Sequence, residues 1–144
     1  MPDPVPDACS CAALREATRH MTRFYDEALA ASGLGINQYS ILSKLGRAGP
    51  QTLRDMADRL VMDRSTLARL LRPLEARKLV TVSVSAEDRR HRVIVLTTEG
   101  GEVMAAARPL WVKAEQRFEA AFGAEKATTL RGVLKHVTTI AFAA

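Results

Sequence analysis

The sequence predicts a mainly α-helical protein that contains one small β-hairpin, and three patterns lead to this fold class. Apolar residues recur three and four positions apart over most of the chain, as they do on one face of a helix. Two short helical segments, separated by a tight break, lie near the middle. The period then changes to two around a charged tip within residues 80–97, which is typical of a hairpin.

The length and composition of the chain suit one domain that covers residues 1–144. Its apolar content is 47%, an ordinary value for a globular protein. Residues 1–8 contain three prolines and no lysine or arginine. We therefore expect them to form a disordered lead and not a secretory signal.

Long helices are predicted at both ends, over residues 9–32 and 102–142. The first has a narrow apolar seam made of Leu14, Ala17, Met21, Phe24 and Ala28. The C-terminal stretch is divided at Gly123 into two helices with apolar stripes of their own. Because such stripes need partners, we expect the two ends to pack on each other, within one chain or between two chains.

The middle of the chain, residues 37–97, is predicted to be a compact head. Thr52 and Asp63 have the positions of caps at the starts of two short helices. These two helices, with the tight turn between them, form a helix-turn-helix candidate. The hairpin over residues 80–97 follows directly and would form a wing beside them.

The net charge of +5 is concentrated in one stretch of the head. Between Arg64 and Arg92, eight basic residues stand against three acidic ones, and the rest of the chain sums to zero. Such a cluster attracts the phosphate backbone of nucleic acids, although a solvated surface is the alternative.

Candidate DNA-binding residues lie on the second short helix and on the hairpin tip. An α-helix fits the major groove, where arginine can bond guanine and hydroxyl groups can reach bases or phosphates, while arginine also suits the narrow minor groove. The helix candidates are Arg64, Ser65, Thr66, Arg69 and Arg72, and the tip candidates are Arg89, Arg90 and Arg92. Asp88 is expected to hold Arg90 in place by a charge-assisted hydrogen bond.

One segment resembles the wing signature of the MarR-type transcriptional regulators, which reads D-x-R, three residues, an aliphatic, one residue, L-T, two residues and G. The segment is Asp88-Arg89-Arg90-His91-Arg92-Val93-Ile94-Val95-Leu96-Thr97-Thr98-Glu99-Gly100. Residues 74–80 are similar to the exit of the family's recognition helix, and the order of elements agrees from about residue 10 to 142.

This resemblance implies an obligate homodimer with interleaved terminal helices, which binds a palindromic operator in double-stranded DNA and which we expect to be a repressor. It implies that the helix Asp63–Lys78 enters the major groove, and that Arg90, oriented by Asp88, enters the minor groove. Lys78 stands where the family often has glycine, so a different cap is expected at the helix end. Val82 stands where a basic residue is common, so one backbone contact is expected to be missing.

Members of this family commonly respond to small aromatic acids or to oxidants, and the sequence offers candidates for both. For an aromatic carboxylate effector, an arginine clamp in a pocket with aromatic walls would use Arg15, Arg19 and His20 of the first helix with Tyr39 of the second. The alternative is that these residues form the wet side of the helix or intersubunit salt bridges.

For an oxidant, the candidates are Cys9 and Cys11 at the start of the first helix, where the helix dipole favours thiolates. Cys11 and Tyr25 have the separation found in the organic-peroxide-sensing branch of the family. The second tyrosine of that branch is replaced here by Ile36, so the sensing set is incomplete. A small packing thiol is the alternative interpretation.

Two further function classes remain open at this point: a thiol peroxidase with Cys11 as its nucleophile, and a non-specific architectural DNA-binding protein. We expect no enzyme, because no nucleotide-binding or acid–base motif is present. No cofactor or metal is expected either, since C-x-C alone supplies two ligands. The two cysteines and the absence of a long apolar run favour a cytoplasmic protein that does not enter a membrane.

Overall fold

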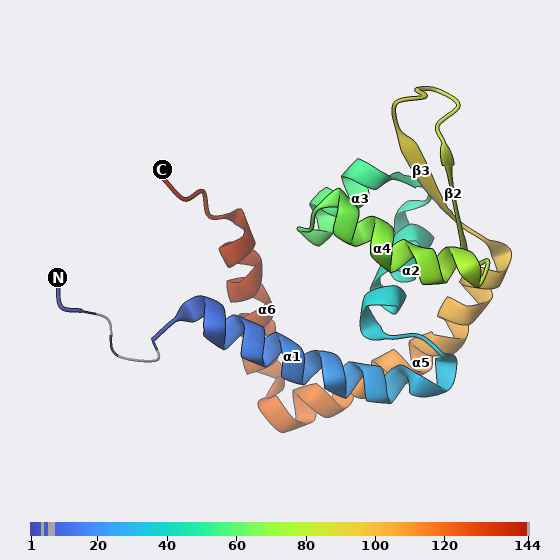
Figure 1. The fold of residues 1–144 in the computed structure, drawn as a ribbon. Coiled ribbons are helices and arrows are strands. Elements are labelled where there is room, and N and C mark those ends of the chain that lie inside the picture. The colour runs from blue at the N-terminus through green and yellow to red at the C-terminus, as the bar shows by residue number, and fades with distance from the viewer. Residues whose placement is uncertain (4, 6–7, 144) are drawn as a thin grey trace.

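The computed structural model describes residues 1–3, 5 and 8–143. It confirms a mainly helical protein with one small antiparallel sheet (Figure 1). In chain order, the elements are α1 (Ser10–Leu29), the 3-10 helix η1 (Ala30–Ser32), α2 (Ile36–Ala48), β1 (Gln51–Thr52), α3 (Leu53–Leu60), α4 (Arg64–Ala76), β2 (Val80–Val84), β3 (Arg92–Leu96), α5 (Thr98–Phe122) and α6 (Ala124–Thr139). The expected disordered lead includes residues 4, 6 and 7, which lie outside the described residues.

The helix boundaries follow from local capping. The side chains of Thr52, Asp63 and Thr97 each accept the backbone N–H three residues later, at 3.0, 2.6 and 2.9 Å, and so begin α3, α4 and α5. Gly123, with φ 105°, separates α5 from α6 as predicted. Because the cap of α5 is Thr97, this helix begins at Thr98, four residues earlier than the sequence pattern indicated.

The sheet has three strands in the order β1-β3-β2, all antiparallel. The hairpin pairs Val80 with Leu96 and Val84 with Arg92, so the expected wing projects from the head (Figure 1). The two-residue strand β1 was not predicted, since a strand this short leaves no periodic signal. It adds to the other edge of β3 and pairs Thr52 with Val93.

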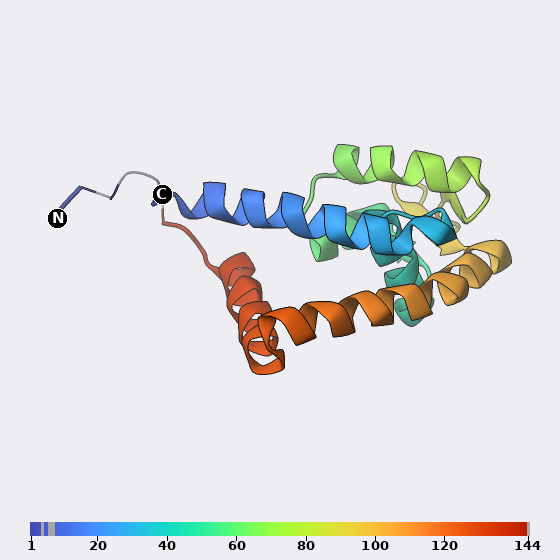
Figure 2. The same cartoon turned by 90° about the horizontal axis from the view of Figure 1, so that it is seen from below.

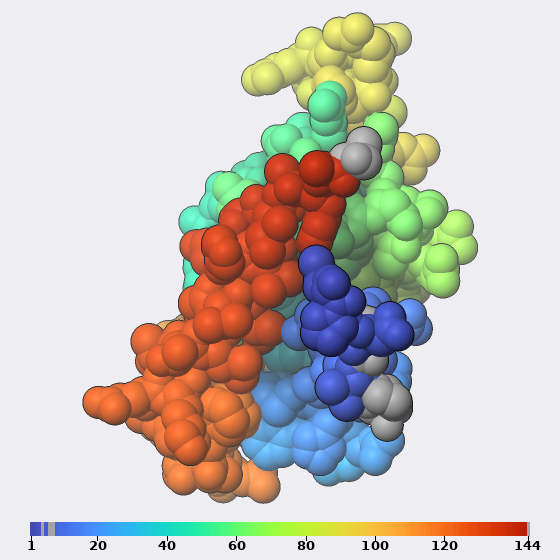
Figure 3. Space-filling view, turned by 90° about the vertical axis from the view of Figure 1, so that its left-hand side faces the viewer, coloured from blue at the N-terminus to red at the C-terminus, as the bar shows by residue number. Residues whose placement is uncertain are grey.

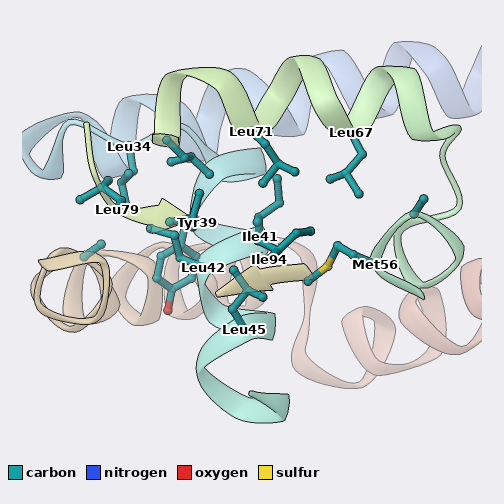
Figure 4. Packing of buried hydrophobic residues seen from close by; sticks show 14 of the residues in the cluster. Leu34, Tyr39, Ile41, Leu42, Leu45, Met56, Leu67, Leu71, Leu79 and Ile94 are labelled. Atoms are coloured by element: carbon teal, nitrogen blue, oxygen red, sulfur yellow. The ribbon is translucent and has the colours of Figure 1, made fainter. Parts of the chain in front are cut away.

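The hydrophobic core lies in the head, between α2, α4 and the sheet (Figure 4). Ile41, Leu42, Leu71 and Ile94 are each at most 1% exposed. The first half and the middle of α5 close this core, and Trp111 stacks on Tyr39 with 6.0 Å between the ring centroids.

The terminal helices extend away from the head. α1 runs alongside α5, and α6 folds back from the far end of α5 (Figures 1 and 2). The face that carries α6 and the start of α1 is shown in Figure 3. On α6, Val133 is 54% exposed and Leu134 and Val137 are each 37% exposed. No helix in the described part of the chain is long and apolar enough to cross a membrane.

Candidate nucleic-acid interface

The start of α4 is held by Asp63. Its carboxylate accepts the N–H of Thr66 at 2.6 Å and the hydroxyl of Ser65 at 2.8 Å. These hydrogen bonds, the one from the Thr66 N–H above all, lower the pKa of Asp63 to about 2. The cap is therefore charged at neutral pH, next to the positive end of the helix dipole.

The two faces of α4 differ in chemistry. Leu67, Leu71 and Leu74 are buried in the core of the head, and Figure 4 shows the first two pointing towards the sheet. The predicted DNA-binding residues lie on the remaining surface, where Arg64, Ser65, Arg69 and Arg72 are exposed and Thr66 is half-buried. The core thus fixes a basic helix face in the outward direction.

The expected contact in the wing is present. The Nε of Arg90 donates to Asp88 Oδ1 at 3.0 Å, and its Nη2 donates to Oδ2 at 2.9 Å. The side chain of Arg90 is nevertheless 86% exposed. The pKa of Asp88 is lowered, first by this side-chain contact and then by the N–H of Arg90. A two-point grip orients an exposed guanidinium without covering it.

Arg54 is a basic residue that the sequence patterns did not single out. It lines a small cavity together with Arg64 of α4 and with Arg90 and Arg92 of the wing. Its position depends on the pairing of β1 with β3, a contact between segments about forty residues apart. A two-residue strand gives no signal from which this neighbourhood could have been predicted.

Lys78, which stands where the resemblance expected glycine, lies at the exit of α4. Lys78 has φ 61°, the left-handed conformation that glycine adopts most easily. The preceding Arg77 donates from Nη1 to the carbonyl of Gly33 at 2.8 Å. The end of the candidate recognition helix is thereby tied to the loop between α1 and α2.

The structure does not bring the candidate effector residues together as one pocket. Tyr39 is only 5% exposed, because its ring packs on Trp111 inside the head. Arg15 and Arg19 are exposed on α1 and line neither of the two cavities beside that helix. The aromatic ring of Tyr39 is therefore apart from Arg15 and Arg19. Of the four candidate effector residues, His20 alone lines one of these two cavities.

That cavity, of about 690 Å³, lies between α1 and the C-terminal end of α5. Arg117 lies over the ring of Phe24, 5.1 Å from its centroid. Phe118 and Phe122 stack with their centroids 5.3 Å apart. A histidine and an arginine beside three aromatic rings form a surface suited to an aromatic anion.

The candidate redox residues are also separated within one chain. Cys9 and Cys11 are exposed, and the sulfur of Cys9 caps α1 by accepting the N–H of Ala12 at 3.4 Å. Tyr25 is fourteen residues from Cys11 along the same helix, which at the helical rise is about 21 Å. Its hydroxyl donates to Glu115 at 2.7 Å, and burial and this contact raise its pKa. A Cys11–Tyr25 pair would have to form between two protomers.

Known proteins are similar in sequence to the winged-helix head. The MarR family model matches residues 34–91. The chain is 32% identical over 90 residues to the organic hydroperoxide resistance transcriptional regulator of Bacillus subtilis, a match that spans 62% of this chain and 61% of that protein. The matched stretch is thus less than two thirds of that relative.

Solved structures extend the similarity over the terminal helices. The Mycobacterium tuberculosis transcriptional regulator MosR, solved in complex with DNA, is 29% identical and superimposes with a TM-score of 0.76, covering 92% of this chain and 99% of that chain. BpsR of Bordetella bronchiseptica, whose DNA binding is regulated by 6-hydroxynicotinic acid, is 21% identical with a TM-score of 0.83 and covers 97% and 100%. The second similarity concerns the fold alone.

Proposed function

We propose that this chain is a sequence-specific, DNA-binding transcriptional repressor of the MarR family. The observation that carries the proposal is the outward basic face formed by α4 and the wing. On α4 that face presents Arg64, Arg69 and Arg72. On the wing, Asp88 grips an exposed Arg90 at two points. The helix would enter the major groove and Arg90 the minor groove.

We propose that the protein acts as a homodimer on a palindromic operator. The terminal helices support this, because α1, α5 and α6 border an apolar hollow of about 700 Å³. Its apolar lining includes Leu14, Met21, Phe118, Leu134 and Val137. A second copy of the same helices would cover these side chains, and its own head would reach a second half-site about one helical turn away.

The experiment is a fluorescence anisotropy titration with the DNA that flanks the protein's own gene, against random duplex of equal length. We expect a preference of about 10³-fold or more for the flanking DNA. Arg90→Ala should weaken operator binding by about 1–3 kcal/mol and leave the oligomeric state unchanged. Equal affinity for both duplexes would favour the architectural alternative, and an unchanged affinity of Arg90→Ala would refute the role of the wing.

We further propose that a small aromatic carboxylate releases the protein from DNA. The cavity with His20, Phe24 and Arg117 supports this, since it pairs two basic side chains with aromatic walls. It replaces the pocket expected from Arg15 and Tyr39. A panel of aromatic acids should include one that lowers operator affinity for the wild-type protein and has no effect on Arg117→Ala. Release that persists in Arg117→Ala would refute this cavity as the effector site.

The second candidate signal is an oxidant acting on Cys9 and Cys11. Their exposure and the capping of α1 by the Cys9 sulfur favour it, as does the similarity to a regulator named for organic hydroperoxide resistance. Peroxide should then release wild-type protein from the operator and fail to release Cys9→Ser/Cys11→Ser. Release of the double variant by peroxide would exclude this mechanism. Peroxide consumption beyond one equivalent per thiol would favour a peroxidase instead.

A further inference from the structure

A small cavity of about 220 Å³ lies where the wing, the start of α3 and the start of α4 meet. We call it the basic notch. Its lining consists of Thr52, Leu53, Arg54, Arg64, Arg90, His91 and Arg92. Four arginines and a histidine thus surround one small space, and no carboxylate in the described part of the chain lines it. The two cavities beside α1 are about three times larger and mostly apolar.

The notch is assembled from three separate segments: the start of α3, the start of α4 and the wing. The pairing of Thr52 with Val93 lays the start of α3 against β3, next to Arg92. The Asp63 cap makes Arg64 the first residue of α4. A strand pair and a capped helix end therefore fix the backbone positions from which these arginines extend, so the folded head brings their charges to one region.

The charges in the notch are largely uncompensated. Among the described residues, Arg54, Arg64 and Arg92 form neither a hydrogen bond nor an ion pair through their side chains. Asp88 binds Arg90, and its Oδ2 lies 3.5 Å from His91 Nε2. Like charges that share one small space repel each other, and an anion in that space removes the repulsion. The arrangement therefore favours a compact anionic group with several acceptor oxygens.

We propose that the basic notch binds one backbone phosphodiester of double-stranded DNA, and that Arg54 contributes a phosphate contact from α3, outside the proposed reading elements α4 and the wing. This inference rests on the proposed function. Because the notch lies between the start of α4 and the wing, a phosphate held there sets the distance of both from the DNA backbone. A phosphate contact carries no sequence information, so its contribution is the same on operator and on random duplex.

The test measures the affinities of the wild-type protein and Arg54→Ala for the flanking DNA and for random duplex between 50 and 200 mM salt, roughly the range over which counterion release is measured. The matched control is Arg59→Ala, which removes an exposed arginine from the same helix outside the notch. Circular dichroism and thermal unfolding establish that each variant is folded.

We expect Arg54→Ala to weaken binding to both duplexes by a similar factor, about tenfold for each phosphate contact that the variant no longer makes. The slope of log affinity against log salt should become shallower by about one for each such phosphate. Arg59→Ala should keep a slope close to that of the wild type. Arg54→Lys should recover part of the slope, since it restores the charge.

Two results would overturn the inference. If Arg54→Ala keeps the wild-type salt slope, or changes it no more than Arg59→Ala does, the notch holds no phosphate while the proposed function stands. If Arg54→Ala weakens operator binding and spares random duplex, Arg54 reads bases instead. Failure of the wild-type protein to bind any duplex would refute the proposed function itself, and the two failures are therefore distinguishable.

Discussion

The winged-helix head and the terminal helices bury their apolar side chains in different ways. In the head, Leu71 and Ile94 are at most 1% exposed, and they belong to a cluster built from several helices and the sheet. On α6, Leu134 and Val137 remain 37% exposed, and Ala127 is the one buried residue among the described residues of this helix. The head thus completes its core within one chain, whereas the ends carry a surface that a second chain would complete.

Leu71→Ala tests the packing of the core in the head, and we expect it to have the largest effect on stability. Removal of a fully buried leucine side chain from a packed core should lower the free energy of unfolding by about 3 kcal/mol. Denaturant unfolding followed by circular dichroism measures this. The comparison is Leu14→Ala in α1, a leucine 37% exposed in one chain. Its effect should be smaller and should depend on protein concentration, because the proposed dimer covers this side chain. A loss below about 1 kcal/mol for Leu71→Ala would mean that the head is not tightly packed.

Leu134→Asp addresses the ends. A carboxylate in the proposed dimer interface would lose its hydration, and the neighbouring Arg131 is already paired with Glu115 and Glu119. The dimer dissociation constant should therefore rise by about 30-fold, or about 2 kcal/mol. Sedimentation at several protein concentrations measures this, while the thermal unfolding of the head should change little. Lys135→Asp places the same carboxylate on the opposite face of α6 and should leave the dimer intact. Equal effects of the two substitutions would place the interface elsewhere.

Gly100→Ala addresses the junction between head and α5. A Cβ at Gly100 would overlap the carbonyl oxygen of Leu79, and it would lie 2.8 Å from the side chain of Leu96. Forcing these apart should lower the free energy of unfolding by about 1–2 kcal/mol. Gly101→Ala is the matched control, because its Cβ would meet Leu96 at an ordinary 3.9 Å. Thermal unfolding that ranks the two variants equally would contradict this explanation of the glycine in the wing motif.

The features that could be predicted from the sequence are those that depend on near neighbours. The Asp63 cap and the grip of Asp88 on Arg90 join residues two or three positions apart, and both are present. The hairpin and the helix stripes follow in the same way from local periodicity.

The features that could not be predicted depend on long-range packing. Tyr39 has the same residue type whether it lines a pocket or stacks on Trp111, and only the position of α5 decides between them. Arg54 likewise joins the wing arginines only through the pairing of β1 with β3. Local sequence patterns therefore predicted α4 and the wing, but they did not predict the long-range contacts between them.

Lys78→Gly has the smallest expected effect and tests a strained point inside the head. Lys78 holds φ 61° at the exit of α4, a conformation that costs an ordinary residue about 1–2 kcal/mol. Glycine removes this strain but loses more backbone entropy on folding, about 0.5–1 kcal/mol. The balance should raise the free energy of unfolding by about 0.5 kcal/mol. Lys78→Ala keeps the strain and should not stabilise the protein, so thermal unfolding of the two variants separates relief of the backbone from loss of the charge. If both variants stabilise the head equally, the gain comes from removing a positive charge near Arg77, and the backbone at Lys78 is not strained.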